Sequence, residues 1–205
     1  MTRTWAFVAA AVVAVGIGGT FLLTQLRAPA DRLEACLRGS VAGGDIGGPF
    51  TLVSETGETV TQDDVITAPT LVYFGYTFCP DVCPLDTDRN AAAMEILDEQ
   101  GIEMNALFVT IDPERDTAEY LAEYTDAFHP RMVGLTGSQE QVDAAVKAYR
   151  VYAKRQESDD PEFYLMDHSN MTYLMDPEAG FVTFFRGDVA PEAMAEQLAC
   201  ISKVV

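Results

Sequence analysis

The sequence predicts an α/β domain in which helices flank a central mixed β-sheet. Apolar, strand-like segments alternate with helical segments between residues 70 and 149, and two further strands and a helix close the chain. A β-α-β-α alternation followed by β-β-α is typical of a sheet covered by helices. The roughly 165 residues that follow the N-terminal apolar stretch and its linker suffice for one domain with a full core.

Turn and cap residues set the bounds of the first expected elements. Gly57 turns a short hairpin, Gly101 ends a helix, and the run from Ser138 to Gln141 resembles a capping box that opens another helix. In chain order, the expected elements are the hairpin of Phe50–Val53 with Thr59–Val60, the buried strand Thr70–Phe74, the helix Leu85–Gln100, the strand Ala106–Ile111, the helix Thr117–Phe128 and the helix that ends at Tyr149.

A loop, two further strands and a last helix complete the predicted domain. Residues 156–162 are polar and acidic, and we expect an exposed loop there. Met171–Leu174 and Phe181–Phe185 form a strand pair across a turn at 176–180, and Pro191–Ile201 is an amphipathic helix. Because two cysteines directly follow the first core strand, the predicted fold is thioredoxin-like.

The N-terminal residues are expected to lie outside this domain. Residues 1–4 form a short tail, and the uncharged apolar run Trp5–Leu26 is long enough to span a bilayer as a transmembrane anchor. Residues 27–48 are rich in glycine and predict a flexible linker, which leaves 49–205 as the domain. Ala28-Pro29-Ala30 keeps a cleaved signal peptide open as an alternative. We favour the retained anchor because the run is long and Arg27 precedes that site.

Charge excludes one class of function. The chain carries a formal charge of −19, and residues 41–205 hold nine basic against thirty acidic side chains. Such a surface repels phosphate backbones, so nucleic-acid binding is not expected.

Two of the four cysteines lie at opposite ends of the predicted domain. Cys36 follows the apolar run, and Cys200 lies in the last helix. They could form a disulfide that ties the two ends together, which requires an oxidising compartment. Two inert, unpaired thiols are the alternative, and the sequence leaves both possibilities open.

The other two cysteines are candidates for disulfide exchange or for metal binding. Cys79 and Cys83 lie between the buried strand and the next helix, where Pro84 suits the first helical turn. A helix N-terminus favours anions, so we expect thiolates there. Thiolates attack disulfides and bind soft metals such as Cu(I). A structural disulfide without activity is the alternative.

A histidine is expected to complete a metal site. His168 precedes the strand at 171, and in a thioredoxin-like fold the loop that enters this strand faces the cysteine loop. Two thiolates and one neutral imidazole suit Cu(I), although Zn(II) also accepts these ligands. His129, before Pro130, is interpreted as an exposed, incidental residue at the end of a helix.

Neighbouring residues are candidates for supporting roles. Asp81 lies between the cysteines, where its negative charge could influence metal binding or partner docking, with a solvated turn residue as the alternative. Asp167 could hydrogen-bond the imidazole and fix its tautomer. Met166, Met171 and Met175 are expected to pack in the core rather than to bind metal.

Four segments together resemble the Sco/SenC family of copper proteins. They are Gly48–Phe50, Leu71–Pro84, Ile111–Thr117 and Asp167–Ser169. The resemblance implies a membrane-tethered, thioredoxin-fold metallochaperone that delivers copper to the binuclear Cu(A) centre of cytochrome c oxidase during assembly. Its copper ligands map onto Cys79, Cys83 and His168, and it implies no role for Cys36 or Cys200. Without a basic, amphipathic transit segment, we expect a bacterial inner membrane with the domain in the periplasm.

Two main functions follow from these residues. The first is transfer of Cu(I) to the copper-bearing oxidase subunit, with another periplasmic copper chaperone or a thiol reductant as a further partner. The second is a thiol–disulfide oxidoreductase that reduces the cysteines of the acceptor, with Cys79 attacking and Cys83 resolving the mixed disulfide, or the reverse. A peroxiredoxin-like peroxidase is a weaker third interpretation, because it has no use for a distant histidine. Whether Cu(II) also binds is left open.

Overall fold

The computed structural model describes residues 32–37, 46–160 and 163–204. The anchor predicted at 5–26 therefore lies outside the described residues. Among the helices that are described, none has the length and apolar character needed to cross a membrane. Residues 32–36 are helical, although they belong to the segment expected to be a flexible linker.

A seven-stranded mixed sheet forms the centre of the domain, as predicted. Its strand order is β2-β1-β5-β4-β3-β8-β9. Strands β3, β4 and β5 run parallel, whereas β1 pairs antiparallel with β5 and β8 pairs antiparallel with β3. The strands are β1 (Thr51–Ser54), β2 (Thr59–Thr61), β3 (Thr70–Gly75), β4 (Asn105–Thr110), β5 (Met132–Thr136), β8 (Met171–Asp176) and β9 (Gly180–Arg186).

Strand β5 was missed by the sequence analysis. Its run of five residues is interrupted by Gly134, which weakens the strand signal. The structure explains the glycine, because a Cβ atom there would lie 2.6 Å from Cβ of Leu121. Leu121 belongs to α4 (Ala118–Asp126), so the glycine lets this helix pack closely on the sheet.

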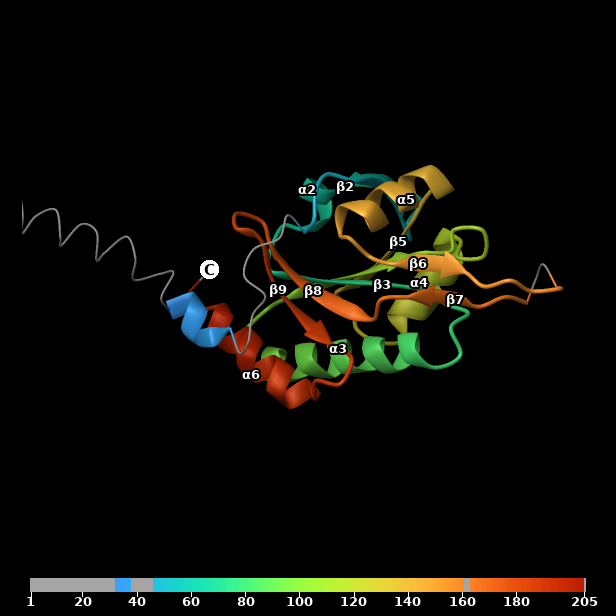
Figure 1. Ribbon diagram of the computed structural model, residues 1–205. Coiled ribbons are helices and arrows are strands. Elements are labelled where there is room, and N and C mark those ends of the chain that lie inside the picture. The colour runs from blue at the N-terminus through green and yellow to red at the C-terminus, as the bar shows by residue number, and fades with distance from the viewer. Residues whose placement is uncertain (1–31, 38–45, 161–162, 205) are drawn as a thin grey trace, which may run out of the picture.

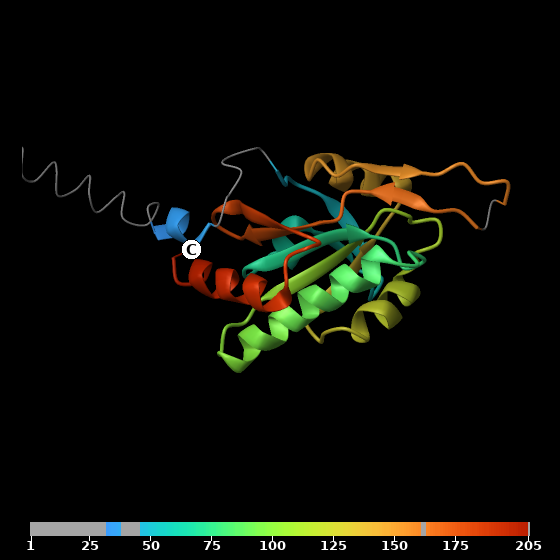
Figure 2. The ribbon, with the colours of Figure 1, turned by 60° about the horizontal axis from the view of Figure 1, so that its bottom comes forward.

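Helices cover both faces of the sheet (Figures 1 and 2). The long helix α3 (Val82–Glu99) lies on one face with α4 and α6 (Pro191–Ile201), and α5 (Gln139–Ala148) lies on the opposite face. The one-turn helix α2 (Gln62–Val65) follows β2. The predicted capping box is present, because Ser138 and Gln141 bond each other's backbone at the start of α5.

Strand β3 contributes to both hydrophobic clusters of the core. Leu71 packs with the apolar side chains of α3 and α6. Val72 and Phe74 pack in the other cluster, where the ring of Phe74 lies 5.1 Å from that of Tyr149. Successive residues of a strand face opposite sides of a sheet, and β3 is buried along its whole length.

A second, two-stranded sheet was also not predicted. Strands β6 (Ala153–Arg155) and β7 (Met166–His168) pair antiparallel and extend away from the main sheet (Figures 1 and 2). His168 therefore ends a short strand, whereas the sequence analysis placed it in the loop that enters the strand at 171. The intervening residues 156–160 are exposed, as expected.

A disulfide closes the domain. Cys36 and Cys200 are bonded, with their Cα atoms 5.6 Å apart. Cys36 is buried in the cluster that also contains Leu198 and Ala199 of α6. The sequence left open either a disulfide or two unpaired thiols, and the structure contains the disulfide. It can form because the helical residues 32–36 pack against α6.

Candidate metal centre

The topology brings three loops to one end of the sheet. Because β3 and β4 are parallel neighbours, the loop that carries Cys79 and the loop that begins at Ile111 leave the sheet at the same end. Strand β8 runs antiparallel to β3, with Tyr73 opposite Thr172. The chain therefore passes over this end of the sheet just before it enters β8, and His168 lies in that stretch.

Two sulfurs and one imidazole meet at this end. The ligand atoms of Cys79, Cys83 and His168 all lie within 4.8 Å of one another, and Nε2 of His168 lies 3.3 Å from Sγ of Cys83. Both thiols are free. Cys83 lies in the first turn of α3 and is fully buried, whereas Cys79 on the preceding loop is 9 % exposed. Within the described residues, no other group of histidine, cysteine and acidic side chains is arranged to hold a metal ion.

The histidine presents a lone pair to the cysteines. Nδ1 of His168 lies 2.9 Å from the carbonyl oxygen of Ser169. A carbonyl can only accept a hydrogen bond, so Nδ1 carries the proton and Nε2 is free to bind a metal. The rings of Tyr73 and Tyr76 stand edge-on to the imidazole at 6.4 and 6.0 Å and restrict its orientation.

Burial keeps Cys83 protonated in the metal-free protein. It raises the pKa of this thiol well above its ordinary value of 9.0, and a hydrogen bond from the backbone of Tyr76 only partly opposes the shift. The expectation of a thiolate at the helix N-terminus is therefore wrong for Cys83, because desolvation outweighs the helix dipole here. A soft cation that binds this sulfur must displace the proton.

A buried ion pair lies beneath the site. Asp86 accepts a hydrogen bond of 3.1 Å from the hydroxyl of Tyr73 and one of 2.9 Å from Nη1 of Arg89. Arg89 also donates to Oγ1 of Thr172 at 2.8 Å, so the network ties α3, which carries Cys83, to β8. This pair was not predicted from the sequence, although the i, i+3 spacing of Asp86 and Arg89 on a helix is a visible signal.

The two aspartates suggested for supporting roles are both exposed. Asp81 is the exposed N-cap residue of α3, and its side chain makes no capping hydrogen bond. Asp167 is exposed and accepts a hydrogen bond of 2.6 Å from Gln156. Neighbouring side chains on a strand point to opposite faces, so the carbonyl of Ser169, and not Asp167, meets the imidazole.

His129 is not an exposed residue. Only 4 % of its surface is accessible, and Nε2 lies 3.3 Å from a carboxylate oxygen of Asp98. The prediction failed because the end of α4 packs against the core, where Phe128 is partly buried. Met175 is buried in the core, and Met166 and Met171 pack against it, as predicted.

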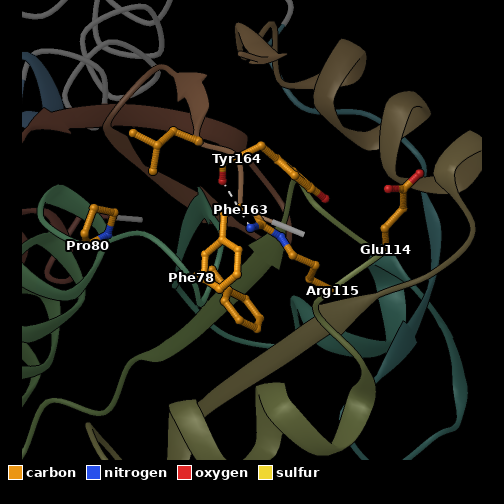
Figure 3. A pocket seen from close by; sticks show the side chains of 7 residues that line it. Phe78, Pro80, Glu114, Arg115, Phe163 and Tyr164 are labelled. Atoms are coloured by element: carbon orange, nitrogen blue, oxygen red, sulfur yellow. Dashed lines mark hydrogen bonds between the residues drawn. The ribbon is translucent and has the colours of Figure 1, made fainter. Parts of the chain in front are cut away.

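A groove includes the two residues that flank Cys79 in the sequence. It has a volume of about 850 Å³ (Figure 3) and is lined by Phe78, Pro80, Glu114, Arg115, Phe163, Tyr164 and Leu165. Phe78 is 50 % exposed and Phe163 is 77 % exposed. Val82 and Leu85, on the first turn of α3, are also exposed. Exposed apolar patches of this kind mark surfaces that contact other molecules.

Comparisons with known proteins agree with this architecture. A family model described as SCO1/SenC matches residues 39–203. Protein SenC of Rhodobacter capsulatus is 50 % identical over 200 residues, which cover 97 % of this chain and 90 % of the relative. The copper-bound structure of Arabidopsis thaliana ScoI is similar with a TM-score of 0.71 and 39 % identity, over 78 % of this chain and 97 % of that one. Copper-bound Bradyrhizobium japonicum ScoI gives a TM-score of 0.68 and 38 % identity, over 75 % and 98 %.

Proposed function

The chain belongs to the SCO1/SenC family, and we propose that it binds Cu(I) through Cys79, Cys83 and His168 and delivers it during assembly of cytochrome c oxidase. The observation that carries this proposal is the meeting of the three ligand atoms within 4.8 Å, across 85 residues of chain between Cys83 and His168. The copper-bound relatives support the choice of metal.

The donor set fits Cu(I) as a cargo. Two sulfurs and one imidazole nitrogen form a soft, three-coordinate set. Nε2 already presents its lone pair, since Nδ1 donates to Ser169, and each free thiol can exchange its proton for the metal. A three-coordinate ion leaves room for an incoming ligand of the acceptor, which is what transfer by ligand exchange requires.

The surroundings of the site support transfer to another protein. Cys79 is the more accessible of the two sulfurs, and the exposed side chains of Phe78, Phe163 and Leu165 form an apolar surface beside it. We propose that this surface contacts the copper-bearing subunit of the oxidase and that the copper enters its Cu(A) centre. We further propose that the apolar run at 5–26 anchors the protein in a bacterial inner membrane with the domain in the periplasm. A disulfide between Cys36 and Cys200 is compatible with such an oxidising compartment.

Removal of the histidine tests the proposal. The full-length protein, reduced and loaded with Cu(I) without oxygen, is expected to hold one copper with two sulfur ligands and one nitrogen ligand by X-ray absorption at the copper edge. His168→Ala is expected to weaken Cu(I) binding strongly while Cys79 and Cys83 can still form a disulfide. His129→Ala is the matched control, because it removes the other histidine and should leave the copper stoichiometry and ligand set unchanged. Unchanged copper affinity in His168→Ala would refute the proposed ligand set.

A thiol–disulfide oxidoreductase is the second candidate function. It is favoured by the arrangement of the free thiols, since the backbone N–H of Cys83 donates to Sγ of Cys79 at 3.3 Å. In this role Cys79 attacks a disulfide of the acceptor, Cys83 resolves the mixed disulfide, and the acceptor leaves with two thiols. The two functions are separated by His168→Ala, which should retain this reduction and lose copper transfer.

A further inference from the structure

We propose that Arg115 is a positioning residue, which fixes Tyr164 and thereby holds the β6–β7 hairpin so that His168 stays beside the cysteines. This inference rests on the proposed function, because it explains how one of the three proposed ligands is kept in place. The structure records no contact between Arg115 and the ligand atoms, so any effect on the site passes through the rings that Arg115 touches, Tyr164 before β7 and Phe78 in the cysteine loop.

The hairpin needs an anchor outside itself. In the described part of the chain, β6 and β7 form a sheet of their own, with only three residue pairs, and the pair at its base is Ala153 with His168. Isolated two-stranded hairpins are marginally stable in water. The position of His168 therefore depends on contacts that the hairpin makes with the rest of the domain.

Arg115 supplies two of these contacts, both with Tyr164. Its guanidinium carbon lies 3.6 Å from the centre of the Tyr164 ring, and Nη1 donates to the carbonyl oxygen of Tyr164 at 3.1 Å. Figure 3 shows the guanidinium between Phe78 and Tyr164, with this hydrogen bond as a dashed line. One arginine thus holds both the ring and the backbone of the residue that precedes β7 by two positions.

Asp112 accepts hydrogen bonds from both Arg115 and Tyr164. One carboxylate oxygen accepts from Nε of Arg115 at 2.5 Å, and the other accepts from the hydroxyl of Tyr164 at 2.7 Å. Tyr164 is only 5 % exposed, and Arg155 of β6 lies 3.5 Å from the centre of its ring. A planar guanidinium can stack and donate in two directions at once, which a lysine cannot do.

The loop that carries Arg115 is itself fixed to the cysteine loop. The buried carboxylate of Asp116 accepts hydrogen bonds from the hydroxyl groups of Thr110 and Thr77, each at 2.6 Å, and from the backbone N–H of Thr77 at 3.0 Å. Thr77 lies two residues before Cys79. The hairpin and the cysteines are therefore both tied to one loop, at residues 112–117, which sets the distance between His168 and the sulfurs.

Two kinds of measurement test this role in the full-length protein. In the metal-free protein, Arg115→Met should accelerate amide hydrogen exchange at Met166, whose N–H bonds the hydroxyl of Tyr76, by roughly tenfold or more, because a charge-assisted hydrogen bond and a stacked cation are lost. Tyr164→Phe keeps the ring and loses only the bond to Asp112, so its effect should be smaller. Arg131→Met is the matched control, since Arg131 bonds Met104 and Asp98, and it should leave exchange at Met166 unchanged.

A double-mutant cycle shows whether Arg115 acts through the histidine. Apparent affinity falls in proportion to the fraction of molecules with His168 in place, so Arg115→Met should weaken Cu(I) binding on the order of tenfold. In the His168→Ala background the same change should have almost no further effect. An equal loss in both backgrounds, or unchanged affinity or exchange in the single variant, would overturn the proposal. If the unaltered protein bound no Cu(I), the proposed function would fail, and exchange at Met166 would still decide whether Arg115 holds the hairpin.

Discussion

The bridge between Cys36 and Cys200 should be the largest single contribution to the stability of the domain. It joins residues separated by 164 positions, and the chain-entropy model assigns a loop of this length about 5 kcal/mol of stabilisation through the unfolded state. This value is an upper limit. Without the bond, residues 32–37 can also leave the folded domain and regain entropy, which offsets part of the loss.

Chemical unfolding of the Cys36→Ala, Cys200→Ala double variant measures this contribution. With a dependence of roughly 2 kcal/mol per molar urea, the midpoint should fall by up to about 2.5 M. Near-ultraviolet circular dichroism is a suitable probe, because Tyr73, Tyr76 and Tyr149 are buried. The only tryptophan of the sequence, Trp5, is not among the described residues. The unaltered protein treated with dithiothreitol is the control and should unfold at the midpoint of the variant. A variant that unfolds at the midpoint of the untreated protein would show that the bridge does not constrain the unfolded chain as reasoned.

Three further predictions concern the buried groups around the site. Cu(I) binding displaces a proton from Cys83, whose pKa is raised by burial, so the apparent affinity for Cu(I) should rise about tenfold per pH unit for each proton released. Competition titrations at pH 6.5, 7.5 and 8.5 measure this affinity, and an affinity that does not change with pH would show that no proton leaves. The pKa of Tyr73 is also raised by burial. Both groups keep protons in the folded state that the unfolded chain releases near their ordinary values of 9.0 and 10.0, so stability is retained below pH 9 and lost above it; a urea midpoint at pH 10.5 equal to that at pH 7 would contradict this. Arg89→Met leaves the carboxylate of Asp86 buried without its cationic partner, both side chains being 6 % exposed, and should lower the free energy of unfolding by about 3–5 kcal/mol. Arg131→Met removes a more exposed arginine and should lower it by no more than about 1 kcal/mol. Equal losses in the two variants would refute the idea that burial makes the Asp86–Arg89 pair more important.

Local patterns predicted most elements of the domain. The buried strand, the cysteine loop and the helix after it follow from apolar periodicity and from Pro84 near the helix start. The hairpin around Gly57 and the capping box at Ser138 also have short-range signals, and both are present. Where such signals were weak, elements were missed. Strand β5 contains Gly134, and β6 and β7 are only three residues long.

Burial was harder to predict than secondary structure. His129 looked incidental at the end of a helix, yet packing at that end leaves it 4 % exposed. Cys83 looked like a thiolate at a helix N-terminus, but complete burial reverses the direction of its pKa shift. Both errors have the same cause, because desolvation depends on which distant segments cover a side chain.

The sequence by itself determined the class of fold, the loop that presents Cys79 and Cys83, and the family, since each can be recognised from short local patterns and their order along the chain. Only the tertiary structure decided that Cys36 bonds Cys200, that Ser169 sets the tautomer of His168, and that Arg115 stacks on Tyr164 and bonds its backbone. These contacts join segments whose alignment is fixed by the order and register of strands across the whole sheet, and no short stretch of sequence carries that information.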